Sequence, residues 1–327
     1  MNDFRIEPLN ALEEIEPLLT RYEFNEYRNY RIFTEEMLQR FLRSRILYRI
    51  ENNATCMVAW SRVGEPVGFI SLARLEWDTA HFGIEMALLD HLMARGTYEQ
   101  RIAVHQDLLE RMLQLCKEWG VEHVSCKVDT GDIACIHALE INGFRNMGTM
   151  VTHLFDKRKQ RIPQAKNLCT IRLLEDQDRP AVLDIARHAF SLDRFHADPY
   201  IPKERSDALY IVWAQKVCDG AMADEVLVAE RRGHVVGFLG YRYDKELEKI
   251  TGVRRVGSGL GAVSPQGRGA YMALVAAALQ RMVPKSDIID VETQINNYPS
   301  LRIEHRLGFE LVRSRHAFHK WLGSSSA

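Results

Sequence analysis

The stretch VSPQGRGAYMALVAAALQRM, which runs from Val263 to Met282, decides how the second half of this chain folds. Its alanine-rich end favours an α-helix, and a strand is expected just before it. Gly267 and Gly269 precede the helix, where they let the backbone approach a ligand closely. The first amide groups of a helix lack intrahelical acceptors and lie at the positive end of its dipole, so they attract phosphate. The stretch therefore predicts a phosphate-binding loop, to which Arg268 adds positive charge.

Two common nucleotide-binding motifs do not fit this loop. A Walker loop needs Lys followed by Ser or Thr at the helix start, whereas Gly269 is followed by Ala270 and Tyr271. A dinucleotide fingerprint needs a third glycine, which GRGAYM lacks. A loop able to hold a pyrophosphate remains, and an ordinary turn is the alternative that the stretch by itself leaves open.

The chain passes through one pattern twice, with a separation of about 165–169 residues, which indicates two copies of one fold. The repeated segments are GEPVGFISL (64–72) with GHVVGFLGY (233–241), CIHALEINGF (135–144) with SLRIEHRLGF (300–309), and FRIEPL (4–9) with TIRLLE (170–175). The copies are expected at 1–157 and 166–323, joined by the basic, solvated stretch DKRKQRIPQAKN (156–167).

Each copy is expected to run strand, helix, two hairpin strands, strand, helix, strand, helix, strand. Because the hairpin makes neighbouring strands antiparallel, the pattern predicts a mixed α/β fold rather than a doubly wound dinucleotide fold. In the second copy we expect strands near 168–173, 224–231, 234–242, 253–263, 287–294 and 309–321, and helices near 177–190, 206–219, 268–283 and 298–307.

Composition limits the classes of function. A length of 327 residues suits two domains, and 46% hydrophobic with 27% charged residues is typical of globular proteins. A net charge of -1 argues against nucleic acid or an anionic membrane as the main partner. The six cysteines form no C-x-x-C pair and no zinc-finger spacing, so no metal is expected. Without a signal peptide or a long apolar run, the sequence predicts a cytoplasmic protein.

The block VSPQGRGA, the strand after it and NYPSLRIEHRLGF together resemble the GNAT superfamily of N-acetyltransferases. The acetyl-coenzyme A loop of that family runs (Q/R)-x-x-G-x-(G/A), and Gln266 and Gly269 fit it, while Tyr271 replaces the final small residue. The last helix of the family follows N-x-x-A-x-x-L-Y-x-K-x-G-F. Of that motif, Asn297, Gly308 and Phe309 fit, and Ser300, Ile303, Glu304 and Arg306 are replacements.

A narrower resemblance links the second half to dTDP-fucosamine acetyltransferases, which acetylate a 4-amino sugar nucleotide. The segments that carry it are SLDRFHADPY (191–200), GRGA (267–270) and TQINN (293–297). In the first half, LEWDTAHFG (75–83) resembles the W-[DE]-x-x-x-F-G stretch of those enzymes, and we expect it to form an aromatic-rich turn.

The resemblance implies direct attack of a neutral amine on the thioester of acetyl-coenzyme A, with no metal. It also implies roles for individual residues. The backbone near Val263 would pair with the pantetheine arm, and Asn297 would bond to it. Cofactor phosphates would lie on Gln266, Gly267, Arg268, Gly269, Ala270 and Tyr271. Arg194, Phe195 and His196 would form the acceptor wall.

Proton transfer is the point at which the sequence departs from the family. Glu304 stands where the family has its thiolate-protonating tyrosine, so it is a candidate acid or base, and Glu292 is a second base candidate. Tyr298 or Tyr271 are other sources of a phenol. The alternatives that place Glu304 and Glu292 in solvent stay open at this point.

The first copy lacks the glycine loop, and its helix-motif positions are Asp132, Cys135, Leu139 and Ile141, so we expect a degenerate GNAT-like domain without cofactor. The leading hypothesis is acetylation of a primary amine on a small acceptor, an amino-sugar nucleotide, which Arg194, Arg254, Arg255 and Arg268 favour. A peptide or antibiotic amine acetyltransferase and a non-catalytic coenzyme A sensor are the alternatives. An oligomer is compatible with each of these hypotheses.

Overall fold

The computed structural model describes residues 4–158, 161–162 and 169–323. The chain forms two compact units, Met1–Thr149 with Ser314–Ala327, and Met150–Arg313. We call them the first unit and the second unit. Much of the expected linker, 159–160 and 163–167, lies outside the described residues, as does the expected start of the second copy at 166.

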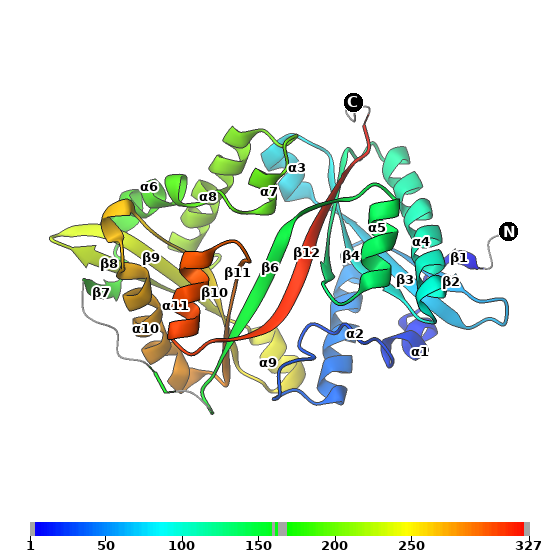
Figure 1. Cartoon of the computed structure of the whole chain (residues 1–327), viewed down its shortest axis with the longest axis horizontal. Coiled ribbons are helices and arrows are strands. Elements are labelled where there is room, and N and C mark those ends of the chain that lie inside the picture. The colour runs from blue at the N-terminus through cyan, green and yellow to red at the C-terminus, as the bar shows by residue number, and fades with distance from the viewer. Residues whose placement is uncertain (1–3, 159–160, 163–168, 324–327) are drawn as a thin grey trace. The chain divides into compact units, whose positions relative to one another are not determined.

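The first unit is a sheet with helices on both faces (Figure 1). Its strand order is β1-β2-β3-β4-β5-β12, antiparallel except for the parallel pair β4 and β5. Helices α4 and α5 pack on one face, and α1 and α2 on the other. The elements are β1 (Arg5–Pro8), α1 (Glu16–Leu19), α2 (Glu35–Glu51), β2 (Thr55–Trp60), β3 (Pro66–Arg74), α3 (Glu76–Phe82), β4 (Met86–Ala94), α4 (Tyr98–Glu118), β5 (His123–Asp129), α5 (Ile133–Ile141), the start of β6 (Arg145–Asp156) and the end of β12 (Glu310–Trp321).

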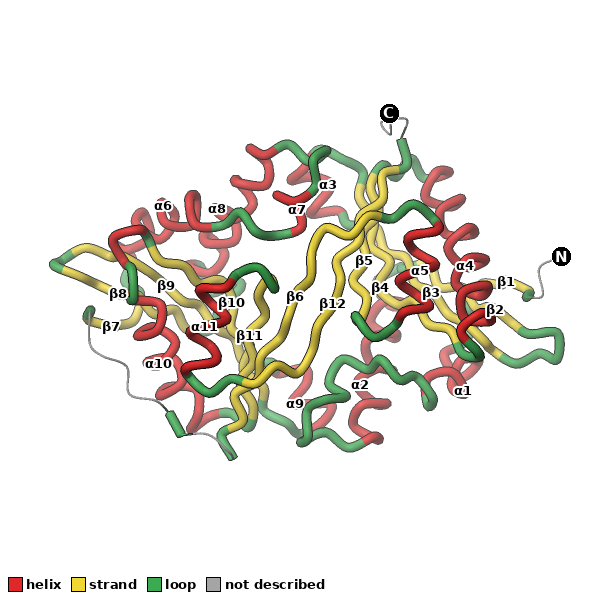
Figure 2. The backbone as a smooth tube through the Cα atoms, viewed as in Figure 1, coloured by secondary structure: helices red, strands yellow, loops and turns green. Residues whose placement is uncertain are grey.

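The second unit repeats this plan with the strand order β7-β8-β9-β10-β11-β6 (Figure 2). Only β10 and β11 are parallel among these neighbours. Helices α10 and α11 share one core, and α6 and α8 share the core of the opposite face. The elements are β7 (Thr170–Leu173), α6 (Arg179–Ala189), α7 (Arg194–Ala197), α8 (Lys203–Cys218), β8 (Glu225–Arg231), β9 (His234–Tyr243), α9 (Lys245–Thr251), β10 (Arg255–Val263), η3 (Pro265–Gly267), α10 (Ala270–Met282), β11 (Ile288–Gln294) and α11 (Tyr298–Arg306). The predicted mixed α/β class is confirmed, and the long helices and strands expected for this copy lie where the periodicity placed them.

The last strands of the two copies are exchanged between the units. Residues 150–156 of β6, which end the first copy, pair antiparallel with β11 of the second unit. Residues 315–321 of β12, which end the second copy, pair antiparallel with β5 of the first unit. The compact units therefore differ from the expected bounds 1–157 and 166–323, because each sheet takes its final strand from the other copy.

A second feature shared by the units is an early end to the parallel strand pairing. In the second unit, β10 pairs with β11 only as far as Gly257 and Asp290. In the first unit, β4 and β5 pair only as far as Leu89 and Cys126. A register shift against the preceding strand follows in each case, and between Ser258 and Gly261 it is a bulge of one residue. Beyond these points the two strands of each pair no longer bond to each other.

The stretch EWDTAHFG is a helix, α3, and not the expected turn. Gly83 ends it with a φ of 67°, the left-handed conformation that glycine adopts after a helix. Its counterpart α9 ends in the same way at Gly252, with a φ of 77°. This repeat was not evident in the sequence because the two segments share little beyond the closing glycine. Across the described residues, no helix has the length and apolar character needed to cross a membrane.

Candidate active site

The predicted phosphate loop opens the helix α10. Gly269 stands at the N-cap with a φ of 87°, and among the described residues no side chain caps this end. Gln266, Arg268 and Gly269 are exposed, so the loop faces solvent and not the core. An exposed helix start without a side-chain cap leaves its first amides available to an anion.

Gly267 and Arg231 hold the loop in place. Gly267 is buried, and a Cβ added there would lie 2.2 Å from the carbonyl oxygen of Val236. Arg231 donates from Nη1 to the carbonyl of Gln266 at 2.7 Å and from Nη2 to the carbonyl of Arg268 at 3.3 Å. Glycine at 267 is therefore required by close backbone contact, and two loop carbonyls are already bound on the side of Arg231.

The edge of β10 that contains Val263 lies beside this loop. Val263 pairs with Gly237 of β9, while β11 has separated from β10 several residues earlier. Asn297 caps α11, since its side chain accepts from the amide of Ser300 and donates to Thr293 Oγ1 at 2.9 Å. Strand edge, loop and Asn297 thus stand where the sequence placed them, and their contacts with a cofactor stay a prediction.

Glu304 is buried, so the alternative that placed it in solvent is wrong. Only 2% of it is exposed, and Ser300 Oγ donates to its Oε1 at 2.8 Å. Its Oε2 lies 2.9 Å from Nδ1 of His153, a residue of β6. Tyr271 joins this group, because its phenol interacts with both Glu304 and Ser300. Burial, helped by the charge of Glu304 and opposed by a hydrogen bond with Ser300, raises the pKa of that phenol to about 12. Tyr298, in contrast, is 62% exposed.

Glu292 lies on the opposite face of the sheet from Glu304. His153 pairs with Val291, so both side chains point to the face that α10 and α11 cover. Glu292 is the next residue of the strand, is exposed, and points to the face on which α6 and α8 pack. The two carboxylates expected in the site are therefore not brought together.

The segment expected as an open acceptor loop begins as a helix, α7. Asp193 caps it by accepting from the amides of Phe195 and His196. Phe195 is only 4% exposed, and the guanidinium of Arg194 lies 4.5 Å from its ring centroid. His196 is held between Asp193, 2.5 Å from Nδ1, and Asp207, 3.0 Å from Nε2. Phe195 and His196 thus stabilise this segment, and contact with an acceptor stays a prediction for all three residues.

Comparison with known proteins identifies the fold. No family model matches the chain. A GCN5-related N-acetyltransferase of Sphaerobacter thermophilus matches 98% of this chain and 96% of its own with a TM-score of 0.61 at 13% identity. A tandem GNAT protein from the clavulanic acid biosynthesis pathway matches 98% and 99%, with a TM-score of 0.54 at 13% identity. The chain has a tandem GNAT fold.

Two further proteins that are similar to this chain have names that refer to sugars. A GCN5-related glucosamine N-acetyltransferase region of a fungal multi-domain β-N-acetylglucosaminidase matches 98% of this chain and 38% of its own, with a TM-score of 0.63 at 14% identity. The spore coat polysaccharide biosynthesis protein SpsD of Bacillus subtilis (strain 168) is 25% identical over 154 residues, 46% of this chain. The match covers 50% of that curated relative, so this chain spans about half of its length.

The first GNAT unit has closed the helix start that the second leaves open. Thr97 and Gln100 form a capping box at the N-terminus of α4. The guanidinium of Arg101 lies 5.4 Å from the ring centroid of Phe24, and Arg28 binds Asp129 at 2.9 Å. Thr97 and Gln100 therefore cap this helix start, but a pocket of about 520 Å³ that Arg95, Gly96 and Arg101 help to line lies beside it, so the expected absence of the cofactor from the first copy stays a prediction.

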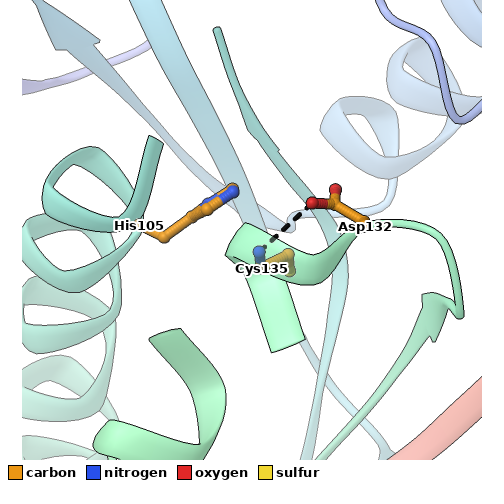
Figure 3. Close-up of side chains that lie close together, drawn as sticks. All are labelled: His105, Asp132 and Cys135. Carbon is orange, nitrogen blue, oxygen red and sulfur yellow. Dashed lines mark hydrogen bonds between the residues drawn. The ribbon is translucent and has the colours of Figure 1, made fainter. Parts of the chain in front are cut away.

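One cluster of the first GNAT unit was missed because its members are far apart in sequence (Figure 3). His105, Asp132 and Cys135 are buried, with ligand-type atoms all within 4.8 Å of one another, a set able to hold a metal ion. Asp132 Oδ1, however, accepts from the amide of Cys135 at 3.1 Å and from Arg101. Burial, together with the charge of Arg101, lowers the pKa of His105 to about 3. Since Arg101 already neutralises the one carboxylate of the set, the cluster serves as a cap and as packing.

Proposed function

We propose that this chain is an N-acetyltransferase that moves the acetyl group of acetyl-coenzyme A to the primary amine of an amino sugar carried on a nucleotide. The observation that carries the proposal is the exposed, glycine-lined start of α10 beside an edge of β10 from which β11 has separated. The first unit has the same fold but a capped helix start, so the open one is not a requirement of the fold.

Two parts of the second unit would hold the cofactor. The first amides of α10 and the side chain of Arg268 would hold the diphosphate, since Gly267 and Gly269 bring the backbone close. The edge of β10 near Val263 would bond the pantetheine arm, with Asn297 beside it. Bound acetyl-coenzyme A supplies the thioester carbonyl that the amine attacks.

Proton transfer would be divided between the two faces of the sheet. Glu292 lies on the face of α6 and α8, where the acceptor segment Arg194–Ala197 begins, so it is the candidate base for the amine. Glu304 lies on the face of α10, next to the cofactor loop, so it is the candidate for the departing sulfur. Tyr271, with a pKa of about 12, keeps its proton at neutral pH and does not act as a base.

An amino-sugar acceptor is supported by two names among the similar proteins, one for polysaccharide biosynthesis and one for glucosamine acetylation. Fewer of the basic residues support a nucleotide-sugar acceptor than the sequence suggested. Arg254 binds Asp287 at 2.8 Å, and Arg255 binds Asp290 at 2.7 Å. Both are neutralised, so among these arginines the support for a nucleotide diphosphate comes from Arg268, which is exposed on the cofactor loop.

The test combines binding with turnover. Isothermal titration should give a micromolar dissociation constant for coenzyme A and for acetyl-coenzyme A, and thermal shift should show stabilisation by both. Release of free thiol is then followed with a panel of dTDP- and UDP-amino sugars, peptides and aminoglycosides. Turnover with an amino-sugar nucleotide supports the proposal. Turnover only with peptides or aminoglycosides refutes the acceptor, and binding without amine-dependent thiol release refutes the enzyme.

A further inference from the structure

The buried ion pair behind the cofactor loop joins residues from both copies of the repeat. His153 lies on β6, the last strand of the first copy, and Glu304 lies on α11 of the second. Their Nδ1 and Oε2 atoms are 2.9 Å apart, which makes an ion pair when the imidazole is protonated, but the two atoms are not aligned for a hydrogen bond and have no other hydrogen-bond partner among the described residues. The side chains are 13% and 2% exposed. Strand exchange places His153 there, because β6 pairs with β11 of the second unit.

The first unit shows what the same place contains when no ion pair is present. Glu304 is the seventh residue of α11, and the seventh residue of α5 is Leu139. His153 pairs with the fourth residue of β11, and Phe318 of β12 pairs with the fourth residue of β5. Leu139 and Phe318 are both fully buried in one apolar core. Folding of this GNAT unit therefore does not depend on ionisable groups at the two positions.

The comparison of the two units indicates that the His153–Glu304 pair serves the reaction and not the stability of the fold. Burying two ionisable groups is costly, and replacement by apolar residues of similar volume is often neutral or stabilising. The pair occurs in the unit with the open helix start, and an apolar pair occurs in the unit whose helix start is capped. Tyr271, in the first turn of α10, interacts with both Ser300 and Glu304, so the pair borders the cofactor loop.

The carboxyl group of the pair is poorly suited by its ordinary chemistry to act alone as an acid at this position. An ordinary carboxyl group has a pKa near 4 and holds no proton at neutral pH, which makes it a poor acid for a departing thiolate. An ordinary imidazole has a pKa near 6.5, so a fraction of it is protonated near neutral pH. An imidazole in contact with a carboxylate can keep a proton available at the carboxylate oxygen.

We propose that His153 is a positioning residue that keeps a proton on the His153–Glu304 pair, and that Glu304 delivers this proton to the departing sulfur. This inference rests on the proposed function. The amine nitrogen bonds to the acetyl carbon as the carbon–sulfur bond breaks, and the thiolate takes the shared proton. The proton lost by nitrogen passes to Glu292 or water and then to solvent, from which the pair is reprotonated. The first copy thus contributes a residue to the site of the second.

The deciding variant transplants the apolar pair of the first unit, His153→Phe with Glu304→Leu. It should fold and bind coenzyme A within twofold of wild type, while kcat falls at least 100-fold. His153→Gln keeps a hydrogen-bond donor without an ionisable ring. It should lower kcat about tenfold with little change in KM for acetyl-coenzyme A, and should remove the decline of kcat at alkaline pH. The control is His305→Gln, an exposed histidine on α11, which should leave kcat unchanged.

A folded double variant that turns over within twofold of wild type overturns the inference. If the double variant does not fold, an unaltered kcat and pH profile in His153→Gln overturn it. If the wild-type protein is inactive on every amine, the proposed function fails, and this result is distinct from a failure of the inference. In that case, histidine-labelled protein is titrated with coenzyme A, and the His153 imidazole signal, assigned with His153→Gln, should move; no movement overturns the inference as well.

Discussion

Replacing Gly267 with alanine tests the cofactor loop most directly. The added Cβ would stand 2.2 Å from the carbonyl oxygen of Val236, whereas ordinary contacts begin at 3.4 Å, so the loop must move. A shift of about 1 Å breaks the alignment of the α10 amides with a diphosphate. Hydrogen bonds to charged groups contribute about 1.5–3 kcal/mol each. Loss of one of them should weaken coenzyme A binding roughly 10- to 150-fold, as measured by isothermal titration.

Gly233→Ala is the matched control in the same unit. Gly233 has a φ of 78° in the β8–β9 turn, and nothing lies within 4 Å of an added Cβ. That variant should lose about 1 kcal/mol of folding stability through backbone strain and keep its affinity for coenzyme A. Wild-type affinity in a folded Gly267→Ala variant would show that this loop does not hold the diphosphate.

Three further predictions concern the loop, the exchanged strand and a buried histidine. Gly269→Glu places a carboxylate against the diphosphate and should abolish the thermal shift with coenzyme A; an unchanged shift contradicts the loop assignment. Removal of residues 310–327 takes β12 from β5 and should lower the urea midpoint of the first unit, whereas a change confined to the second unit contradicts the exchange. His105→Leu should make stability less sensitive to acid between pH 6.5 and pH 3, and an identical pH dependence in wild type and variant contradicts this.

The sign of the His105 effect follows from proton binding. The folded-state pKa of His105 is lowered to about 3, mainly by burial, while an unfolded histidine titrates near 6.5. Between these values the unfolded chain binds more protons, so the free energy of unfolding falls as the pH falls. At pH 4 this contribution is about 3 kcal/mol, and above pH 6.5 it vanishes. Lowering of the His91 pKa to about 4, also by burial, acts in the same direction and remains in the variant.

Local patterns in the sequence were sufficient for the main elements and for the loop. The alanine-rich run after Gly269 and the alternating strands around Gly237 reflect periodicity and turn chemistry that are local to each segment. The short helix α7 was missed because its cap, Asp193, acts over only one turn. Pairing between distant strands has no local signal, so the exchange of β6 and β12 could not be predicted.

His153 was also missed, although a signal for it existed. His153 lies in a strand outside the two motifs, the glycine loop and the last helix, so no motif identified it. Alignment of the two copies, however, sets His153 against Phe318 and Glu304 against Leu139. A concerted change from two apolar to two ionisable residues at buried positions is visible in the sequence once the repeat is known. Their contact required the structure.

The exchange of final strands also limits how the two copies can evolve. Either copy of a tandem repeat would ordinarily be free to accumulate substitutions or to be deleted. Here β6 of the first copy completes the sheet of the second unit, and β12 of the second copy completes the sheet of the first unit. Neither half can be cut away, duplicated by itself or shuffled into another gene without leaving its former neighbour with an unpaired edge.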